Sequence, residues 1–120
     1  MQRVAALRDR LVEGTLSAIE GSVELAPRRL RVAGSAQLLI PGTVAEELLV
    51  LLDEAGVAAS AGSACASGAV EPSHVLRAMG LPPSRCAEVV RFSLGWSTTK
   101  SEIDHTLAVV PAAVDRLRVH

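Results

Sequence analysis

Aromatic side chains are nearly absent from this chain: they make up 2% of its 120 residues, and tyrosine is missing. Proteins that stack nucleic-acid bases depend on such side chains. Charge does not compensate, because 12 basic residues face 13 acidic ones, for a net charge of −1. No apolar run approaches the roughly 20 residues that span a bilayer, and the first residues lack a signal-peptide pattern. We therefore expect a soluble, cytoplasmic protein that binds neither nucleic acid nor membranes.

Cysteine is scarce as well, with only Cys65 and Cys86 present. Two cysteines cannot build the disulfide framework of a small secreted domain, so we expect free thiols in a reducing compartment. Together with His74 they lack the close ligand pairs that zinc sites use. The sequence therefore predicts no metal site.

The apolar content is ample: 49% of the residues are hydrophobic and 21% charged, and the mean hydropathy is +0.34. A chain of this length and composition can bury a hydrophobic core without disulfides or structural metal ions, which excludes an intrinsically disordered protein. We expect residues 1–120 to form a single domain.

Periodicity predicts a first helix that ends at Gly21, followed by strands over residues 23–25 and 29–40. A Pro41-Gly42 turn closes the second strand. We expect the next helix to begin at Thr43, with Glu46 completing a capping box, and to end at Gly56 before a strand over 57–60. The apolar positions expected on the two helices are Val4, Leu7, Leu11, Leu16 and Ile19, then Val44, Leu48, Leu51 or Leu52, and Ala55.

In the second half, a brief helix is predicted over residues 71–80 and a strand over 88–94. The last helix opens with a second capping box, Thr99 with Glu102, and Pro111 should kink it or start a new helix. These elements amount to about four strands and four helices, a two-layer α+β domain. The strand has Val90, Phe92 and Leu94 on one face and Val89, Arg91 and Ser93 on the other; the helix stripe is Ile103, Leu107, Val110, Val114 and Leu117.

Residues 60–69 read SAGSACASGA, and every one of them is small. We expect a mobile loop with the thiol of Cys65 in its middle. Taken without any resemblance, the sequence favours a structural role for Cys65, as a small side chain that fills a tight turn. The alternative is a reactive thiol on a flexible loop, activated by a basic residue that is distant in the sequence but close in the folded protein. Likewise, the pattern around Arg91 favours a simple structural reading, in which this residue lies on the solvent-exposed face of a strand whose other face is buried.

The stretches SAGSACASG, EPSHVLRAMG and VVRFSLGWSTTKSEID, in this order and spacing, resemble the carboxy-terminal part of cysteine desulfurases. These pyridoxal-phosphate enzymes form a group of the class V aminotransferase family, and the most similar members serve iron–sulfur cluster assembly. The resemblance begins near Val4 and covers almost the whole chain. It implies the small carboxy-terminal domain of a fold-type I pyridoxal-phosphate enzyme.

The resemblance also implies a chemistry. The family's loop cysteine, matched by Cys65, attacks the sulfur of L-cysteine held on the cofactor as a ketimine. It becomes a persulfide, alanine is released, and the sulfur passes to an acceptor protein. The arginine of the family's RFSLG stretch, matched by Arg91, is expected to hold the substrate carboxylate through two parallel N–H bonds. Relatives of this kind also imply a homodimer.

What the chain lacks is the family's cofactor machinery. Its single lysine, Lys100, does not match the Schiff-base lysine, so we expect pyridoxal phosphate to belong to a large domain absent from this chain. The chain alone is then expected to bind no cofactor, to be inactive, and to self-associate through the surface that such a domain would cover. We expect no catalytic role for His74, His105, His120 or Cys86.

Two alternatives stay open. One is a stand-alone persulfide carrier or interaction module without catalysis of its own. The other is a related class V aminotransferase or lyase in which Cys65 is not the nucleophile. Departures from the family's usual pattern at Ala66 and at Trp96-Ser97 leave room for a different sulfur acceptor.

Overall fold

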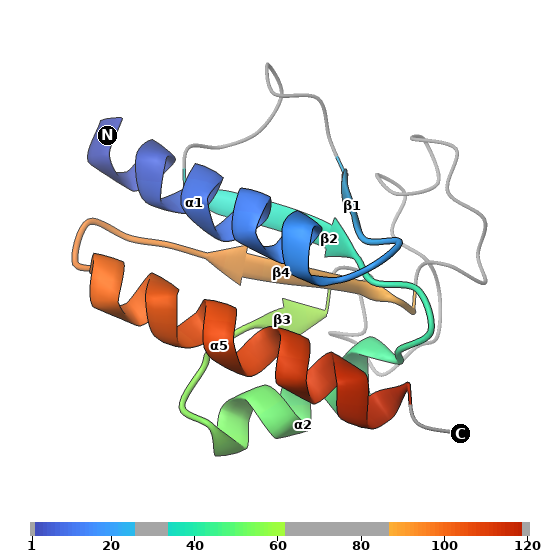
Figure 1. Ribbon diagram of the computed structural model, residues 1–120. Coiled ribbons are helices and arrows are strands. Elements are labelled where there is room, and N and C mark those ends of the chain that lie inside the picture. Colours follow the sequence, from blue (N-terminus) through green and yellow to red (C-terminus); the bar gives the residue numbers. More distant parts are fainter. Residues whose placement is uncertain (1, 26–33, 62–86, 119–120) are drawn as a thin grey trace.

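The computed structural model describes residues 2–25, 34–61 and 87–118. These ranges contain three helices and a four-stranded sheet, and Figure 1 shows the helices as a layer against one face of the sheet. This confirms the predicted α+β class, and the predicted helix over 71–80 lies outside the described residues. The elements are α1 (Gln2–Ala18), β1 (Val23–Leu25), β2 (Ser35–Leu39), α2 (Ala45–Glu54), β3 (Ser60–Ala61), β4 (Val89–Ser93) and α5 (Lys100–Leu117).

The sheet has the strand order β1-β2-β4-β3, and each neighbouring pair is antiparallel. Strands β2 and β4, which are far apart in the sequence, pair along their whole length at the centre. They approach closely at one end, where the Leu94 N–H donates to the Gly34 carbonyl at 2.6 Å. A Cβ at position 34 would stand 2.2 Å from the Leu94 carbonyl oxygen, so only glycine fits there.

The core lies between the helices and the sheet face that they cover, which we call the inner face. Alternate residues of β2 and β4 point into it, as the period of two in a strand requires. Its fully enclosed side chains are Leu11, Leu38, Ile40, Leu48, Leu52, Val90, Val110 and Val114.

Helix α1 buries most of the predicted stripe, but the prediction for Leu16 is wrong, since its side chain is 38% exposed. Val12 and Thr15 occupy the buried face instead. The Thr15 hydroxyl is satisfied inside the helix, donating to the Leu11 carbonyl at 2.8 Å. A helix turns by 3.6 residues, and Leu16 falls on the flank of the face that contains Leu11 and Thr15.

The predicted start of α2 is also wrong. The N-cap is Val44, with an extended backbone and no side-chain cap, and its side chain is 46% exposed. The Thr43 hydroxyl donates to the Ile40 carbonyl at 2.7 Å, so it serves the preceding turn and not a capping box. Gly56, at φ +82°, follows the helix end as expected.

The strand predicted over 57–60 lies further along the chain, at Ser60–Ala61. Val57 is buried, but its N–H donates to the Leu52 carbonyl at 2.8 Å and so belongs to the end of α2. An apolar residue just after a helix thus has the same hydropathy signature as the first residue of a strand. Ser60, the last residue of the predicted strand and the first of the expected loop, pairs with β4, so its strand assignment is confirmed. The loop expectation is wrong for Ala61, which also pairs with β4.

Helix α5 begins with the predicted capping box. The Thr99 N–H donates to Glu102 Oε1 at 2.7 Å, and the Glu102 N–H donates to Thr99 Oγ1 at 3.1 Å. The helix continues through Pro111, so a new helix does not begin there. Burial of Val110, Ala113 and Val114 against the core offsets the hydrogen bond that proline cannot donate.

Candidate functional site

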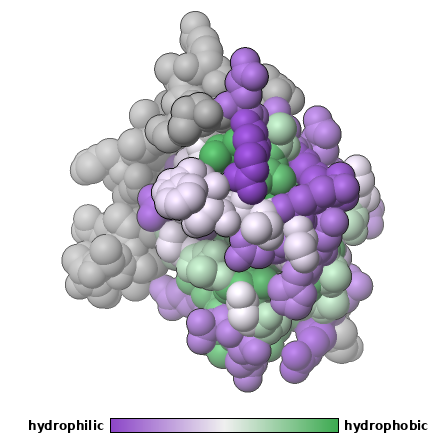
Figure 2. All heavy atoms as spheres, turned by 90° about the vertical axis from the view of Figure 1, so that its left-hand side faces the viewer, coloured by the Kyte–Doolittle hydropathy of each residue, from purple (hydrophilic) through white to green (hydrophobic). Residues whose placement is uncertain are grey.

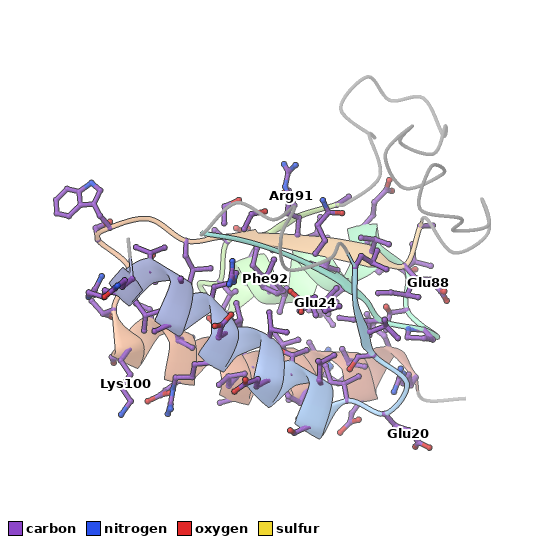
Figure 3. The ribbon with its side chains drawn as sticks, turned by 90° about the horizontal axis from the view of Figure 1, so that it is seen from above. Glu20, Glu24, Glu88, Arg91, Phe92 and Lys100 are labelled. Atoms are coloured by element: carbon purple, nitrogen blue, oxygen red, sulfur yellow. The ribbon has the colours of Figure 1, made fainter. Side chains whose placement is uncertain are left out.

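Strand β4 presents Arg91 on the sheet face opposite the helices, which we call the outer face. Its neighbours Val90 and Phe92 point into the core, whereas Arg91 is exposed. In Figure 3, Arg91 extends away from α1 and α5, and Phe92 points toward them. No hydrogen bond or salt bridge occupies the Arg91 side chain among the described residues. The outer face therefore carries a guanidinium with no partner in the described part of the chain, and this group is the one best suited to bind a carboxylate.

Gln37 and Ser60 flank Arg91 on the two adjacent strands. Gln37 of β2 and Ser60 of β3 are both direct partners of Arg91 in the register. Residues opposite each other in an antiparallel pair share a face, and their Cβ atoms lie about 4.5–5.5 Å apart. The three side chains thus form one polar row across three strands, which we call the polar row.

The rest of the outer face differs in character. On this face Val89 is fully buried, and Leu25 and Leu39 pack against it. Leu25 is the partner of Gln37 on β1, so this apolar patch adjoins the polar row at Gln37. Beyond the polar row on the other side, Ser35 and Ser93 are paired across β2 and β4. The polar row therefore lies between an apolar patch and a pair of hydroxyl groups.

The segment that follows β4 is held to the start of α1. The Arg3 guanidinium donates to the Trp96 carbonyl at 2.9 Å and also to the Thr98 carbonyl. The Thr98 hydroxyl accepts from the Gly95 N–H at 2.9 Å. Trp96 itself is 85% exposed. In Figure 2 this end of the molecule shows mainly hydrophilic side chains with apolar ones between them.

The other sequence candidates fall elsewhere. Cys65, Cys86, His74 and His120 lie outside the described residues, so the structure does not place Cys65 relative to Arg91. His105 is exposed on α5, and its Nε2 lies 2.9 Å from the Ala55 carbonyl oxygen, a contact that joins α5 to the end of α2. The described part of the chain contains no group of three or more His, Cys, Asp or Glu that could hold a metal ion. It also contains no helix both long and apolar enough to cross a membrane.

Gln37 is the site residue that sequence reasoning missed. It is the one long polar side chain in the strand Ser35–Leu39, and this contrast was the available signal. Its proximity to Arg91 depends on how β2 pairs with β4, which hydropathy does not reveal. Ser60 was missed because its pairing with Arg91 joins two strands that are far apart in the sequence.

Comparison with protein families gives one match, to the family described as aminotransferase class-V, over residues 1–106. Among curated proteins, the cysteine desulfurase of Klebsiella pneumoniae is 41% identical over 118 residues, which is 98% of this chain and 30% of that protein. An IscS-like cysteine desulfurase of Mycobacterium tuberculosis is 42% identical over 97% of this chain and 30% of its own length. The chain thus spans about 30% of the length of these relatives.

Solved structures show the same fold. A NifS-like protein superposes with a TM-score of 0.79 at 23% identity, over 96% of this chain and 28% of the other. A NifS-like protein of Rickettsia africae gives a TM-score of 0.76 at 21% identity, over 93% and 28% of the two chains. At these identities the likeness concerns the fold.

Proposed function

The chain belongs to the aminotransferase class-V family, and on this premise we propose that it is the carboxy-terminal domain of a cysteine desulfurase. The identity of 41–42% to two cysteine desulfurases along nearly the whole chain supports this substrate class over others in the family. The observation that carries the proposal within the molecule is the outward-facing guanidinium of Arg91, which pairs with none of the described residues.

In this proposal, Arg91 binds the carboxylate of L-cysteine. Two parallel N–H donors match the two carboxylate oxygens, which fixes the orientation of the amino acid as well as its position. The polar row on either side of Arg91 would keep the bound carboxylate among hydrogen-bonding groups and away from the apolar patch around Val89. Arg91 thereby sets where the substrate sulfur lies.

Cys65 is the proposed sulfur acceptor. Its thiolate attacks the sulfur of bound L-cysteine, so that an S–S bond forms on Cys65 as the substrate's C–S bond breaks. A proton takes the place of sulfur on the carbon, and L-alanine leaves. Chain connectivity is compatible with this role, because Cys65 follows Ser60, the partner of Arg91, by five positions. Five residues span at most about 18 Å.

Pyridoxal phosphate supplies the electron sink for this chemistry in the family. The described residues do not fit it by themselves. The chain's single lysine, Lys100, is exposed at the first turn of α5. Figure 3 shows it on the helix side of the sheet, whereas Arg91 points from the other side. We therefore place the cofactor on a further domain of the proposed enzyme. The homodimer and the sulfur-acceptor protein expected for such an enzyme likewise stay proposals.

The test is a chimera in which this chain replaces the matching segment of the Klebsiella pneumoniae enzyme. We expect it to release alanine from L-cysteine. Cys65→Ser should abolish persulfide formation, seen in mass spectra as loss of the adduct of about 32 Da, one sulfur atom, while leaving the cofactor absorbance intact. Cys86→Ser is the matched control and should keep the activity.

Arg91→Gln in the same chimera should raise KM for L-cysteine about 10- to 100-fold, since a hydrogen-bonded ion pair contributes about 1.5–3 kcal/mol. A chimera that releases no alanine, or a Cys65→Ser variant that still forms the persulfide at the parent rate, would contradict the proposed function. If the isolated chain gains the sulfur from a persulfide donor while the chimera is inactive, the result supports the carrier module instead.

A further inference from the structure

Gln37 carries a buried polar atom without a partner. Its Oε1 is enclosed, and no hydrogen bond reaches it. It is the only such side-chain atom found in the described ranges. Nearly all buried polar atoms in proteins are hydrogen-bonded, and leaving an acceptor unpaired is unfavourable. The unpaired amide oxygen in the polar row therefore suggests that a hydrogen-bond donor reaches Gln37 Oε1 when a ligand binds.

Arg91 is the donor that the register brings to it. Gln37 and Arg91 are direct partners on β2 and β4, and both lie on the outer face. The hydroxyl groups on this face, those of Ser35, Ser60 and Ser93, are on shorter and neutral side chains, and Ser60 is a partner of Arg91 on the strand beyond it. A guanidinium has five N–H donors, and a carboxylate bound side-on uses two of them. The remaining N–H groups are then free to donate to a neighbouring amide oxygen.

A bound carboxylate would make this contact favourable. Arg91 extends away from the sheet (Figure 3), where its charge stays hydrated; an unpaired charge laid against a partly buried surface would lose that hydration. Once a carboxylate neutralises the charge, the guanidinium can lie against the sheet. There it can satisfy the Gln37 oxygen.

We propose that Gln37 is a positioning residue for Arg91: its Oε1 accepts one guanidinium N–H and fixes the plane in which Arg91 presents its other donors to a carboxylate. The inference rests on the proposed function, in which Arg91 binds the substrate carboxylate. It adds a second residue, on another strand, that controls the orientation of the bound amino acid.

The test is a double-mutant cycle in the chimera described above. Gln37→Met keeps the length of the side chain and removes the acceptor. We expect KM for L-cysteine to rise about fivefold to tenfold, with kcat within about twofold of the parent. In the Arg91→Gln background the same substitution should change KM by less than about twofold, because the two residues act as one unit. Ser35→Ala, on the same face and strand, is the matched control and should leave KM unchanged.

The outcomes separate the two proposals. If Arg91→Gln leaves KM unchanged, the carboxylate role of Arg91 is wrong. If Arg91→Gln raises KM but Gln37→Met does not, or raises it equally in both backgrounds, Gln37 does not position Arg91. Should Gln37→Met fail to fold, Gln37→Leu replaces it, and the same outcomes decide.

A measurement on the 120-residue chain itself needs no catalysis. With sodium acetate as the carboxylate probe, exchange of the Arg91 Nε–H with water is followed by ¹⁵N NMR, and Arg91→Lys assigns the signal. Acetate should slow this exchange about fivefold more in the parent than in Gln37→Met. Equal slowing in both chains would overturn the proposal.

Discussion

Adjacent residues on β4 have opposite surroundings. Phe92 is 3% exposed on the inner face, enclosed by the helices, while Arg91 on the outer face is exposed and unpaired among the described residues. The inner face is continuous and apolar, whereas the outer face joins an apolar patch to a polar row. The inner face thus stabilises the fold, and the proposed binding site lies on the outer face, so substitutions on the two faces should affect different measurements.

The largest effect on stability is expected from Leu38→Ala. Leu38 is fully buried on the inner face of β2, and truncating such a residue removes about 2–5 kcal/mol from the free energy of unfolding. Leu39→Ala, on the outer face of the same strand, is the matched control and should cost at least about 1 kcal/mol less, because Leu39 is only partly buried. Urea unfolding of the 120-residue chain measures both. Equal losses of unfolding free energy in the two variants would show that both faces of the sheet contribute equally to stability, contrary to this comparison.

A smaller loss, about 2–3 kcal/mol, is expected from Gly34→Ala, since the new methyl group would stand 2.2 Å from the Leu94 carbonyl oxygen. Backbone on both sides must then shift at the end of β2 and β4, next to the paired Ser35 and Ser93. Gly95→Ala is the control, because nothing lies within 4 Å of its added Cβ. Thermal unfolding followed by circular dichroism compares the two variants. Similar melting temperatures would show that β2 and β4 can move apart at Gly34 without loss of stability.

The smallest effect on stability is expected from Arg91→Gln, within about 0.5 kcal/mol of the parent in urea unfolding of the chain. The side chain is exposed and takes part in no hydrogen bond with the described residues, so its removal breaks no interaction within that part of the chain. The same substitution is expected to have a large effect on KM in the chimera. A loss above 1 kcal/mol would show that Arg91 supports the fold, and would weaken its assignment to the substrate.

Local signals in the sequence predicted much of this fold correctly. The capping box of Thr99 and Glu102 and the alternation along β4 are both present in the structure, because each depends on residues within a few positions of one another. The same reasoning failed at Thr43, where the hydroxyl had two possible partners, and the preceding turn took it. It failed at Val57, where burial at a helix end resembled a strand.

For the candidate site, the family resemblance and the position of Arg91 on the face of β4 opposite Val90 and Phe92 could both be predicted from the residues alone. The folded chain was needed to find that Gln37 and Ser60 lie on either side of Arg91, and that the buried Gln37 oxygen has no partner among the described residues. The physical reason is that strand register is set by packing and hydrogen bonding between segments far apart in the chain. The pattern within one strand fixes which face a residue occupies, but not which residue stands beside it.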